Sequence, residues 1–398
     1  MRPEGRIHMN QLALRSKFNE VFKKEKLYFF APGRVNLIGE HTDYNGGHVF
    51  PCALSFGTHC VFCKRDDRKI RLYSLNFPNQ GIIEADLDNI AYDKKQDWAN
   101  YPLGVIKTLQ NHGYVIDQGF ELLFWGDIPN GAGLSSSASI ELATAVAMNK
   151  VFNLYIPQVE LVKFCQEAEN KFVGMNCGIM DQFAIGMGKE GNAILLDCNT
   201  LDYEYAPLDL KGMSIVIMNS NKRRELADSK YNERRGECER ALKALQTQLP
   251  IKSLGELSVE EFEKHKDLIV NPVERKRAKH AVYENQRTLE AVKKLKEGDL
   301  ATFGKLMNES HVSLRDDYEV TGKELDALAE AAWAQQGVLG ARMTGAGFGG
   351  CAIALVKDAD VKKFIDNVGK IYHDKTGLRA DFYIASVGGP AREMEKMY

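Results

Sequence analysis

Hydrophobic and polar positions in the first part of the chain predict several short strands. Apolar runs that end at turn-forming residues are typical of buried strands. Such runs are Leu27–Ala31, which stops at a Pro-Gly pair, Thr58–Lys64, Ile70–Ser74 and Phe120–Trp125. The charged turn Arg65–Arg68 connects Thr58–Lys64 to Ile70–Ser74, so we expect these two runs to pair as a hairpin.

Helical periodicity follows these strands. An apolar stripe with further apolar residues around it predicts a nearly buried helix over Ser137–Phe152. Tyr155–Lys171 predicts a second helix, with Pro157 near its start, where proline is tolerated.

The second half of the chain repeats both patterns. Strands are expected at Met213–Met218, Cys351–Val356 and Ala380–Val387, and helices from about Glu225 to Leu249 and over Ile269–Lys296, Leu300–Leu314 and Val361–Tyr372. A chain of 398 residues is longer than one hydrophobic core usually serves. We therefore predict a two-domain α+β (mixed α/β) protein, divided into residues 1–205 and 206–398, with Asp197–Leu210 as the crossing segment.

The segment from Gly33 to Gly47 breaks the apolar pattern with a concentration of hydrogen-bonding groups. It contains a cation, two carboxylates, an imidazole, a phenol and two amides. A polar surface turn is the ordinary alternative. Such density suits a ligand that is itself covered in hydroxyls, and the rest of the chain favours that interpretation.

Two glycine-rich stretches add candidate chemistry. Gly131–Ser139 lies between a predicted strand and a buried helix, where glycines allow close approach and the helix N-terminus attracts phosphate. Helix capping by Ser135–Ser137 alone is the simpler alternative, but one serine suffices for a cap. Thr344–Gly350 matches the dinucleotide pattern G-x-G-x-x-G formally, yet it precedes a strand instead of opening a helix. We therefore expect a flexible loop that closes over a substrate, with a plain tight turn as the simpler alternative.

Composition narrows the function classes. A formal net charge of −2 gives no reason to expect nucleic acid or an acidic membrane as partner, and no apolar run is long enough to span a bilayer. The first residues lack the apolar stretch of a secretory signal, and the eight cysteines are scattered, so we expect reduced thiols in a cytoplasmic protein. Cys60 and Cys63 have zinc-knuckle spacing without a second pair; in a strand they point to opposite faces, so we expect buried thiols.

The three motifs Gly33–Gly47, Gly131–Ser139 and Thr344–Gly350, in this order, resemble the GHMP small-molecule kinase family. Within that family, Gly33–Gly47 is similar to the galactokinase signature. Cys177–Gln182 and Asn219–Asn221 with Tyr231 share this similarity. The resemblance covers about residue 10 to residue 395, and it implies two mixed α/β domains with the active site in the cleft between them.

The resemblance also implies roles for individual residues. The sugar site is expected to comprise Arg34, Glu40, His41, Asp43, Gly178, Asp181 and Tyr231. ATP is expected near Trp98 and around the loop residues Gly131, Ala132, Gly133, Leu134, Ser135, Ser136, Ser137, Ala138 and Ser139. Ser137 and Glu169 are the expected Mg²⁺ ligands, with Ser135 or Ser136 as alternatives to Ser137.

The implied reaction is transfer of the ATP γ-phosphoryl group to the C1 hydroxyl of D-galactose. Asp181 is expected to accept the hydroxyl proton or to orient the hydroxyl, and Arg34 to stabilise charge on the moving group. The partners implied are ATP and the sugar, with no obligate protein partner. Two alternatives stay open: the same chemistry on N-acetylgalactosamine or arabinose, and a non-catalytic sensor that binds galactose and ATP.

Overall fold

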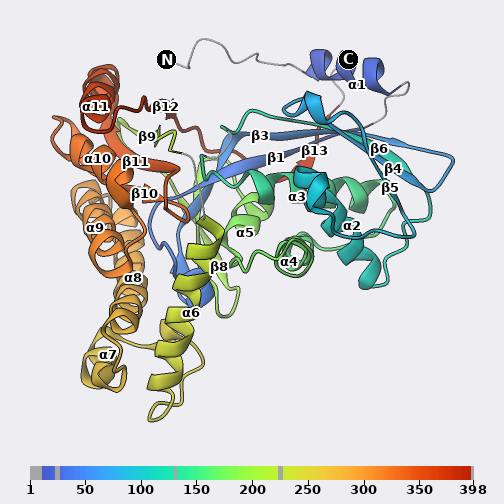
Figure 1. Cartoon of the computed structure of the whole chain (residues 1–398). Helices are drawn as coiled ribbons and strands as arrows, with labels where there is room; N and C mark the ends of the chain where they lie inside the picture. Colours follow the sequence, from blue (N-terminus) through green and yellow to red (C-terminus); the bar gives the residue numbers. More distant parts are fainter. Residues whose placement is uncertain (1–10, 23–26, 130–131, 223–226, 396–398) are drawn as a thin grey trace.

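A computed structural model describes residues 11–22, 27–129, 132–222 and 227–395. The first half of the chain builds a six-stranded sheet in the order β13-β1-β3-β6-β4-β5 (Figure 1). Its strands are β1 (Leu27–Asn36), β3 (Pro51–Lys64), β4 (Lys69–Ser74), β5 (Ile83–Asp86), β6 (Phe120–Gly126) and, from the end of the chain, β13 (Arg392–Glu393).

Helices cover both faces of this sheet unequally. One face carries α2 (Asn100–Asn111), α3 (Ser136–Val151), α4 (Gln158–Glu167) and α5 (Met180–Met187), and the other carries α1 (Gln11–Val21) (Figure 1). Cys60 and Cys63 of β3 lie on opposite faces of this sheet. Cys60 is buried in the core beneath α2–α5, whereas Cys63 packs with Leu14 and Phe18 of α1. The prediction of buried thiols on opposite faces is confirmed, and all eight cysteines are free.

The second half forms a four-stranded sheet in the order β10-β11-β9-β12, with helices packed against it. The strands are β9 (Met213–Asn219), β10 (Val338–Thr344), β11 (Cys351–Lys357) and β12 (Asp381–Ile384). The helices are α6 (Ala227–Leu245), α7 (Val259–His265), α8 (Pro272–Lys296), α9 (Leu300–Ser313), α10 (Gly322–Trp333) and α11 (Val361–Thr376). The mixed α/β architecture predicted for both halves is confirmed.

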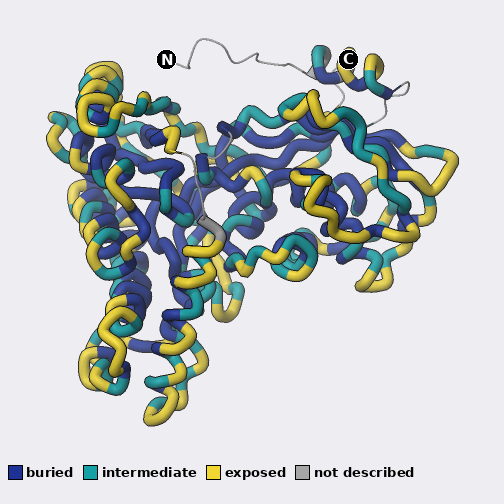
Figure 2. The backbone as a smooth tube through the Cα atoms, viewed as in Figure 1, coloured by how far each residue is buried: buried dark blue, intermediate teal, exposed yellow. Residues whose placement is uncertain are grey.

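The two halves share part of their core. Val35 and Phe50 of the first half pack in one buried cluster with Ile217, Ile353 and Phe303 of the second. Figure 2 shows this continuous buried interior, with exposed residues gathered at the loops and at the far ends of α6 and α7. The shared core fixes the loops of both halves against each other.

A third, three-stranded sheet has the order β2-β7-β8, with β2 (His48–Val49), β7 (Asn192–Asp197) and β8 (Tyr203–Pro207). β8 lies inside the segment that we expected to cross between domains, so that segment contains a strand paired with β7. The domain division at residues 205 and 206 stays a prediction.

Two details of the strand predictions are wrong. β1 does not stop at Pro32-Gly33 but continues to Asn36, paired with β3 after a register shift between Pro32 and Arg34. At this shift the Arg34 N–H donates to the Leu134 carbonyl at 3.1 Å. A Cβ at Gly33 would lie 2.9 Å from the same oxygen, so glycine permits this approach.

The expected hairpin is absent among the described strands. β6 lies between β3 and β4, antiparallel to the first and parallel to the second. All but the last residue of β6 are buried, and such an apolar strand is stabilised by neighbours on both edges.

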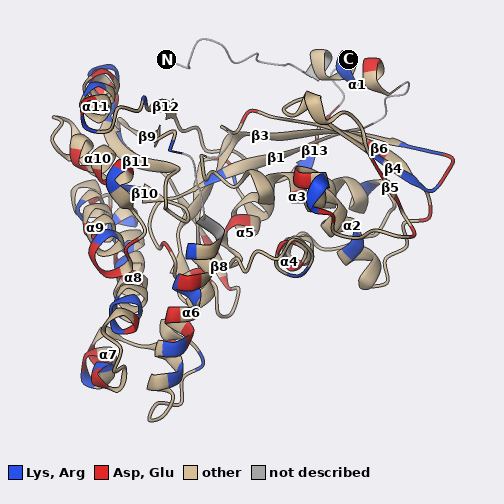
Figure 3. Cartoon of the chain, viewed as in Figure 1, with Lys and Arg blue, Asp and Glu red and all other residues tan. Residues whose placement is uncertain are grey.

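The predicted helices are present, with shifted ends. The second one begins at Gln158 and continues as the π-helical turn Ala168–Val173, which contains Glu169. Acidic and basic residues are interspersed over both halves (Figure 3). None of the helices in the described parts of the chain combines the length and apolarity needed to cross a bilayer.

Candidate active site

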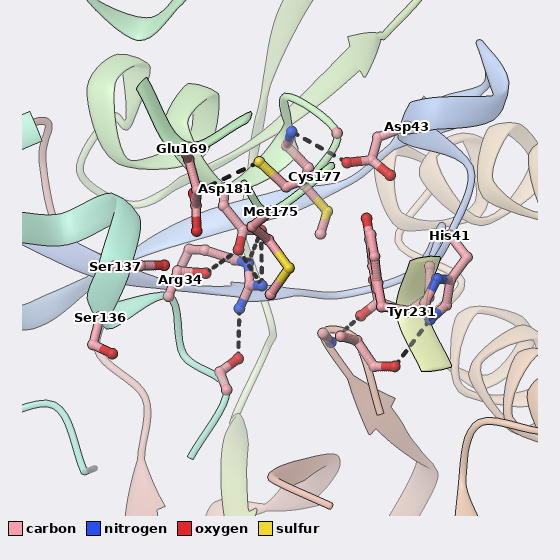
Figure 4. Close-up of a pocket in the computed structure, with 17 residues that line it drawn as sticks. Arg34, His41, Asp43, Ser136, Ser137, Glu169, Met175, Cys177, Asp181 and Tyr231 are labelled. Carbon is pink, nitrogen blue, oxygen red and sulfur yellow. Dashed lines mark hydrogen bonds and ion pairs between the residues drawn. The ribbon is translucent and has the colours of Figure 1, made fainter. Parts of the chain in front are cut away.

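A cavity of about 230 Å³ opens between the two halves (Figure 4). It is lined by Arg34, Glu40, His41, Asp43, Gly133, Ser135, Ser136, Ser137, Glu169, Met175, Cys177, Gly178, Met180, Asp181, Tyr231, Gly345 and Ala346. All seven residues expected at the sugar site are in this set. The structure therefore brings together motifs that lie up to about three hundred residues apart in the chain.

Arg34 and Asp181 form a forked ion pair at one end of the cavity. Nε and Nη2 of Arg34 donate to the two carboxylate oxygens at 2.7 and 2.8 Å. Ser135 Oγ donates to Oδ2 at 2.5 Å, and Arg34 Nη1 donates to the Gly133 carbonyl at 2.8 Å. The Arg34 side chain is buried and that of Asp181 is 30% exposed, so the carboxylate is fixed in orientation and still open to a ligand.

Asp43 is held at the opposite side of the cavity by close packing on Gly178. A Cβ at Gly178 would lie 1.9 Å from Asp43 Oδ2, so this wall requires glycine. Met180 N–H donates to the same oxygen at 3.4 Å. Burial, together with the charge of Asp181, raises the pKa of Asp43 to about 6. Its carboxylate is therefore ionised at neutral pH but titrates in the mildly acidic range.

His41 is locked in one tautomer. Its Nε2 lies 3.1 Å from the Ala346 carbonyl, which only accepts, so Nε2 carries the proton. Its Nδ1 lies 2.7 Å from the Tyr44 hydroxyl, which donates to it. Burial lowers the pKa of His41 to about 3, so the ring is neutral. The ring of Tyr231 lies 5.6 Å from that of His41 and completes this aromatic wall.

Glu40 is almost fully buried and is bound by donors from both halves of the chain. Asn36 Nδ2 donates to Oε2 at 2.7 Å, and the Gly345 N–H donates to Oε1 at 2.6 Å. Arg342 Nη1 lies 3.4 Å from Oε1. Burial raises the pKa of Glu40, while Arg342 and Arg34 oppose that effect.

The start of α3 lies at the same end of the cavity as the Arg34–Asp181 fork (Figure 4). Ser135 occupies the N-cap position with φ of 63°, and its side chain bonds Asp181 instead of capping the helix. Ser136 and Ser137 line the cavity. Ala132, Leu134, Ala138 and Ser139 are buried and do not line the cavity, so Gly133, Ser135, Ser136 and Ser137 are the loop residues that the structure places there; Gly131 lies outside the described residues. The uncapped helix start matches a phosphate site.

Ser137 and Glu169 fit a magnesium ion by their chemistry and proximity. They are hydrogen-bonded through their side chains, and burial and Asp181 raise the pKa of Glu169 to about 7. Gln182 Nε2 also donates to Glu169 Oε2 at 2.5 Å. Hydroxyl and carboxylate oxygens are ligands that Mg²⁺ prefers, with phosphate oxygens and water completing its shell. Within the described residues no group of three or more His, Cys, Asp and Glu forms a metal site.

A second cavity, also of about 230 Å³, meets the first at Ser136 and Ser137. Its walls include the aromatic residues Phe77, Trp98, Tyr101 and Phe124. Trp98 Nε1 is buried with no hydrogen-bond partner among the described atoms. The predicted adenine-side residue therefore lies in a separate aromatic cavity, next to the serines but away from the charged wall.

Comparisons with known proteins agree with this arrangement. The galactokinase galactose-binding signature matches residues 16–64, the GHMP kinases N terminal domain matches residues 100–189, and the GHMP kinases C terminal domain matches residues 291–374. The chain is 62% identical to a galactokinase of Fusobacterium nucleatum over 95% of this chain and 98% of the relative. The chain belongs to the galactokinase family. It is also 57% identical to a galactokinase of Bacillus subtilis over 96% of this chain and 98% of the relative.

Solved structures extend the family assignment to the fold. The structure of Lactococcus lactis galactokinase complexed with galactose matches with a TM-score of 0.95 and 55% identity, covering 96% of this chain and 99% of that one. The mevalonate kinase of Methanococcus jannaschii matches with a TM-score of 0.64 at 20% identity, over 92% of this chain and all of that one, and shares the fold. This chain is thus an ATP-dependent sugar kinase with the GHMP fold.

Some residues around the site of this chain were not predicted from the sequence. Gln182 bridges Glu169 and the buried Glu141, and Arg342 contacts Glu40 from β10. The position of Glu141 inside a mostly apolar predicted helix was the sequence feature that could have indicated a buried carboxylate. An arginine just before the glycine-rich loop was the hint for Arg342.

Proposed function

We propose that the protein transfers the γ-phosphoryl group of ATP to the C1 hydroxyl of D-galactose, with galactose 1-phosphate and ADP as products. The observation that carries this proposal is the Arg34–Asp181 fork at the junction of the two cavities. The fork lies beside the start of α3, where a phosphate chain is expected, and faces the cavity with the galactokinase signature residues.

The charged cavity would hold the sugar. Carboxylates of Glu40 and Asp43 accept hydrogen bonds from hydroxyls, and Tyr231 presents a phenol whose pKa burial raises well above its usual value. Such a site disfavours epimers, because a misplaced hydroxyl leaves a buried polar group unpaired at a cost of about 1–3 kcal/mol. The selectivity for galactose over other sugars would come from this wall.

The aromatic cavity would hold the adenine, and the triphosphate would run along the start of α3. Because Ser136 and Ser137 line both cavities, the γ-phosphate of a nucleotide bound in the second cavity would reach the first at these serines. Ser137 and Glu169 would bind Mg²⁺, which when bound neutralises charge on the phosphate oxygens.

In the transfer step the C1 oxygen forms a bond to the γ-phosphorus while the bond from that phosphorus to the bridging oxygen of ADP breaks. The C1 hydroxyl proton leaves that oxygen: the Asp181 carboxylate accepts it, or, where Asp181 only orients the hydroxyl, an oxygen of the transferred phosphoryl group accepts it. Arg34 holds the carboxylate in place through its fork and places a positive charge next to the moving group.

Sugar-dependent ADP release with Mg-ATP tests the proposal. The assay is run in parallel on galactose, N-acetylgalactosamine, arabinose and glucose, with a no-sugar control for background ATP hydrolysis. We expect turnover on galactose and little on glucose. Turnover on another sugar only would change the substrate, and galactose binding without turnover would indicate a sensor.

A further inference from the structure

Arg342 is a fully buried cation on β10, two residues before the glycine-rich loop. Its Nε donates to Ser310 Oγ at 3.1 Å, and its Nη1 donates to the Asn36 carbonyl at 3.1 Å. These bonds fix the guanidinium between α9 of the second half and β1 of the first. The residue does not line the cavity, so it would act on a ligand only through other residues.

The guanidinium touches the sugar wall through Glu40. Arg342 Nη1 and the Gly345 N–H both reach Oε1, at 3.4 and 2.6 Å. Of the donors that the described residues supply, only Asn36 Nδ2 reaches Oε2. Glu40 Oε1 thus accepts hydrogen bonds only from the second half of the chain among the described residues. Glu40 Oε2 accepts one hydrogen bond and can accept another from a ligand.

A second buried carboxylate lies on the other side of the guanidinium. Glu284 Oε1 is 3.9 Å from Arg342 Nη2 and accepts hydrogen bonds from Ser310 Oγ at 2.5 Å and Gly39 N–H at 3.1 Å. Burial would raise the pKa of Glu284, but Arg287, His280 and Arg342 lower it to about 2. Without Arg342, the interior would hold two carboxylates with one cation fewer between them.

We propose that Arg342 is a positioning residue for sugar binding: it holds Glu40 Oε1 against the Gly345 N–H and keeps the carboxylate an acceptor for a sugar hydroxyl. This inference rests on the proposed function. It assigns to the residue before the glycine-rich loop a role in substrate affinity, separate from the transfer step. Arg34 and Asp181 form their own fork, whereas the hydrogen bonds of Arg342 go to Ser310, Asn36 and Glu40.

The test compares Arg342→Lys and Arg342→Met in the full chain. Galactose Kd is measured by calorimetry, and kcat and both KM values by steady-state kinetics. Arg342→Met removes a charged hydrogen-bond donor from the buried carboxylate of Glu40. We therefore expect it to raise the galactose Kd and KM about tenfold or more. We expect Arg342→Lys, which keeps the charge, to recover part of that loss, and kcat and the ATP KM to stay within about threefold.

Arg277 provides the matched control. It is 2% exposed and bonds Glu237 at 2.8 Å and Glu319 at 2.6 Å, away from the residues that line the cavity. Arg277→Lys and Arg277→Met are expected to lower thermal stability as the Arg342 variants do, but to leave the galactose Kd of the folded protein unchanged. A general loss of stability would not separate the two arginines in this way.

A double-mutant cycle identifies Glu40 as the intermediary. Glu40→Gln removes the charge that Arg342 faces, so Arg342→Lys is expected to change the galactose Kd in that background less than about twofold. Should Arg342→Met not fold, Ser310→Ala replaces it, since it keeps the charge and removes the Nε partner; a rise in galactose Kd is expected. Wild-type galactose affinity in the folded Arg342→Lys and Ser310→Ala proteins overturns the inference. A wild-type protein without galactose turnover would instead refute the proposed function.

Discussion

The two cavities that meet at Ser136 and Ser137 differ in the side chains that line them. The first is walled by charged groups that are already paired with one another, such as Arg34 with Asp181. The second includes four aromatic side chains in its wall, and the buried Nε1 of Trp98 has no partner among the described atoms. A sugar offers many hydroxyls and needs fixed acceptors, whereas a purine offers a flat face and needs apolar walls. Under the proposed function, sugar selectivity would therefore come from the first cavity and nucleotide affinity from the second.

Replacing Asp181 should give the largest effect, because it is the carboxylate at the junction. Asp181→Asn keeps the shape and removes the charge, so we expect kcat to fall about 10²–10⁴-fold while the galactose Kd changes little. Single-turnover kinetics and calorimetry measure the two quantities. Asp67→Asn is the matched control, because Asp67 also accepts a fork from an arginine, Arg65, but lines neither cavity; it should leave kcat within about threefold. A wild-type kcat in Asp181→Asn would remove this residue from the transfer step.

Changing Asp43 should separate the two cavities. Asp43→Ala removes an acceptor of charge-assisted hydrogen bonds, so we expect the galactose KM to rise about tenfold to a hundredfold and the ATP KM to change less than about threefold. Both constants come from crossed substrate titrations. Equal rises in the two KM values would place Asp43 outside the sugar wall.

The pH dependence of the galactose KM should follow Asp43. Its pKa is raised to about 6, so the carboxylate is mostly ionised at pH 7 and mostly protonated at pH 5. Because the ionised form is the stronger acceptor, the galactose KM should rise as pH falls, by up to about tenfold between these values. Burial raises the pKa of Glu169, the expected Mg²⁺ ligand, to about 7, so its titration would change Mg-ATP binding over the same pH range. The measurement therefore uses saturating Mg-ATP. A slope that persists in Asp43→Asn would assign the titration to another group.

Replacing Trp98 should give the smallest effect and act on the nucleotide alone. Trp98→Leu keeps an apolar wall and loses ring stacking, so the ATP KM should rise about twofold to tenfold with an unchanged galactose KM. Trp125→Leu is the control, since Trp125 packs on the opposite face of the sheet with α1. A larger effect of Trp98→Leu on galactose than on ATP would contradict the separation of the two cavities.

The sequence predicts local features better than long-range pairings. The faces of Cys60 and Cys63 follow from the period of two along a strand, and the buried helix after the serines follows from its apolar stripe. The hairpin prediction failed because β6 lies between β3 and β4, and nothing in the turn Arg65–Arg68 indicates that insertion.

The candidate site shows the same limit. The motifs named its lining residues, but not the bonds between them. Ser135 donates to Asp181 from a residue with a left-handed backbone, and the contact of Arg342 with Glu40 joins β10 to the turn after β1. Such contacts carry no periodicity that a sequence pattern would reveal.

The most direct test of the account is the position of the phosphate on the product. Wild-type protein is incubated with galactose and Mg-ATP, and the sugar phosphate is examined by phosphorus–proton correlated NMR. The account predicts a single product in which phosphorus couples to the anomeric proton. Coupling to a proton on any other carbon, or ADP release without a sugar phosphate, would contradict transfer to the C1 hydroxyl.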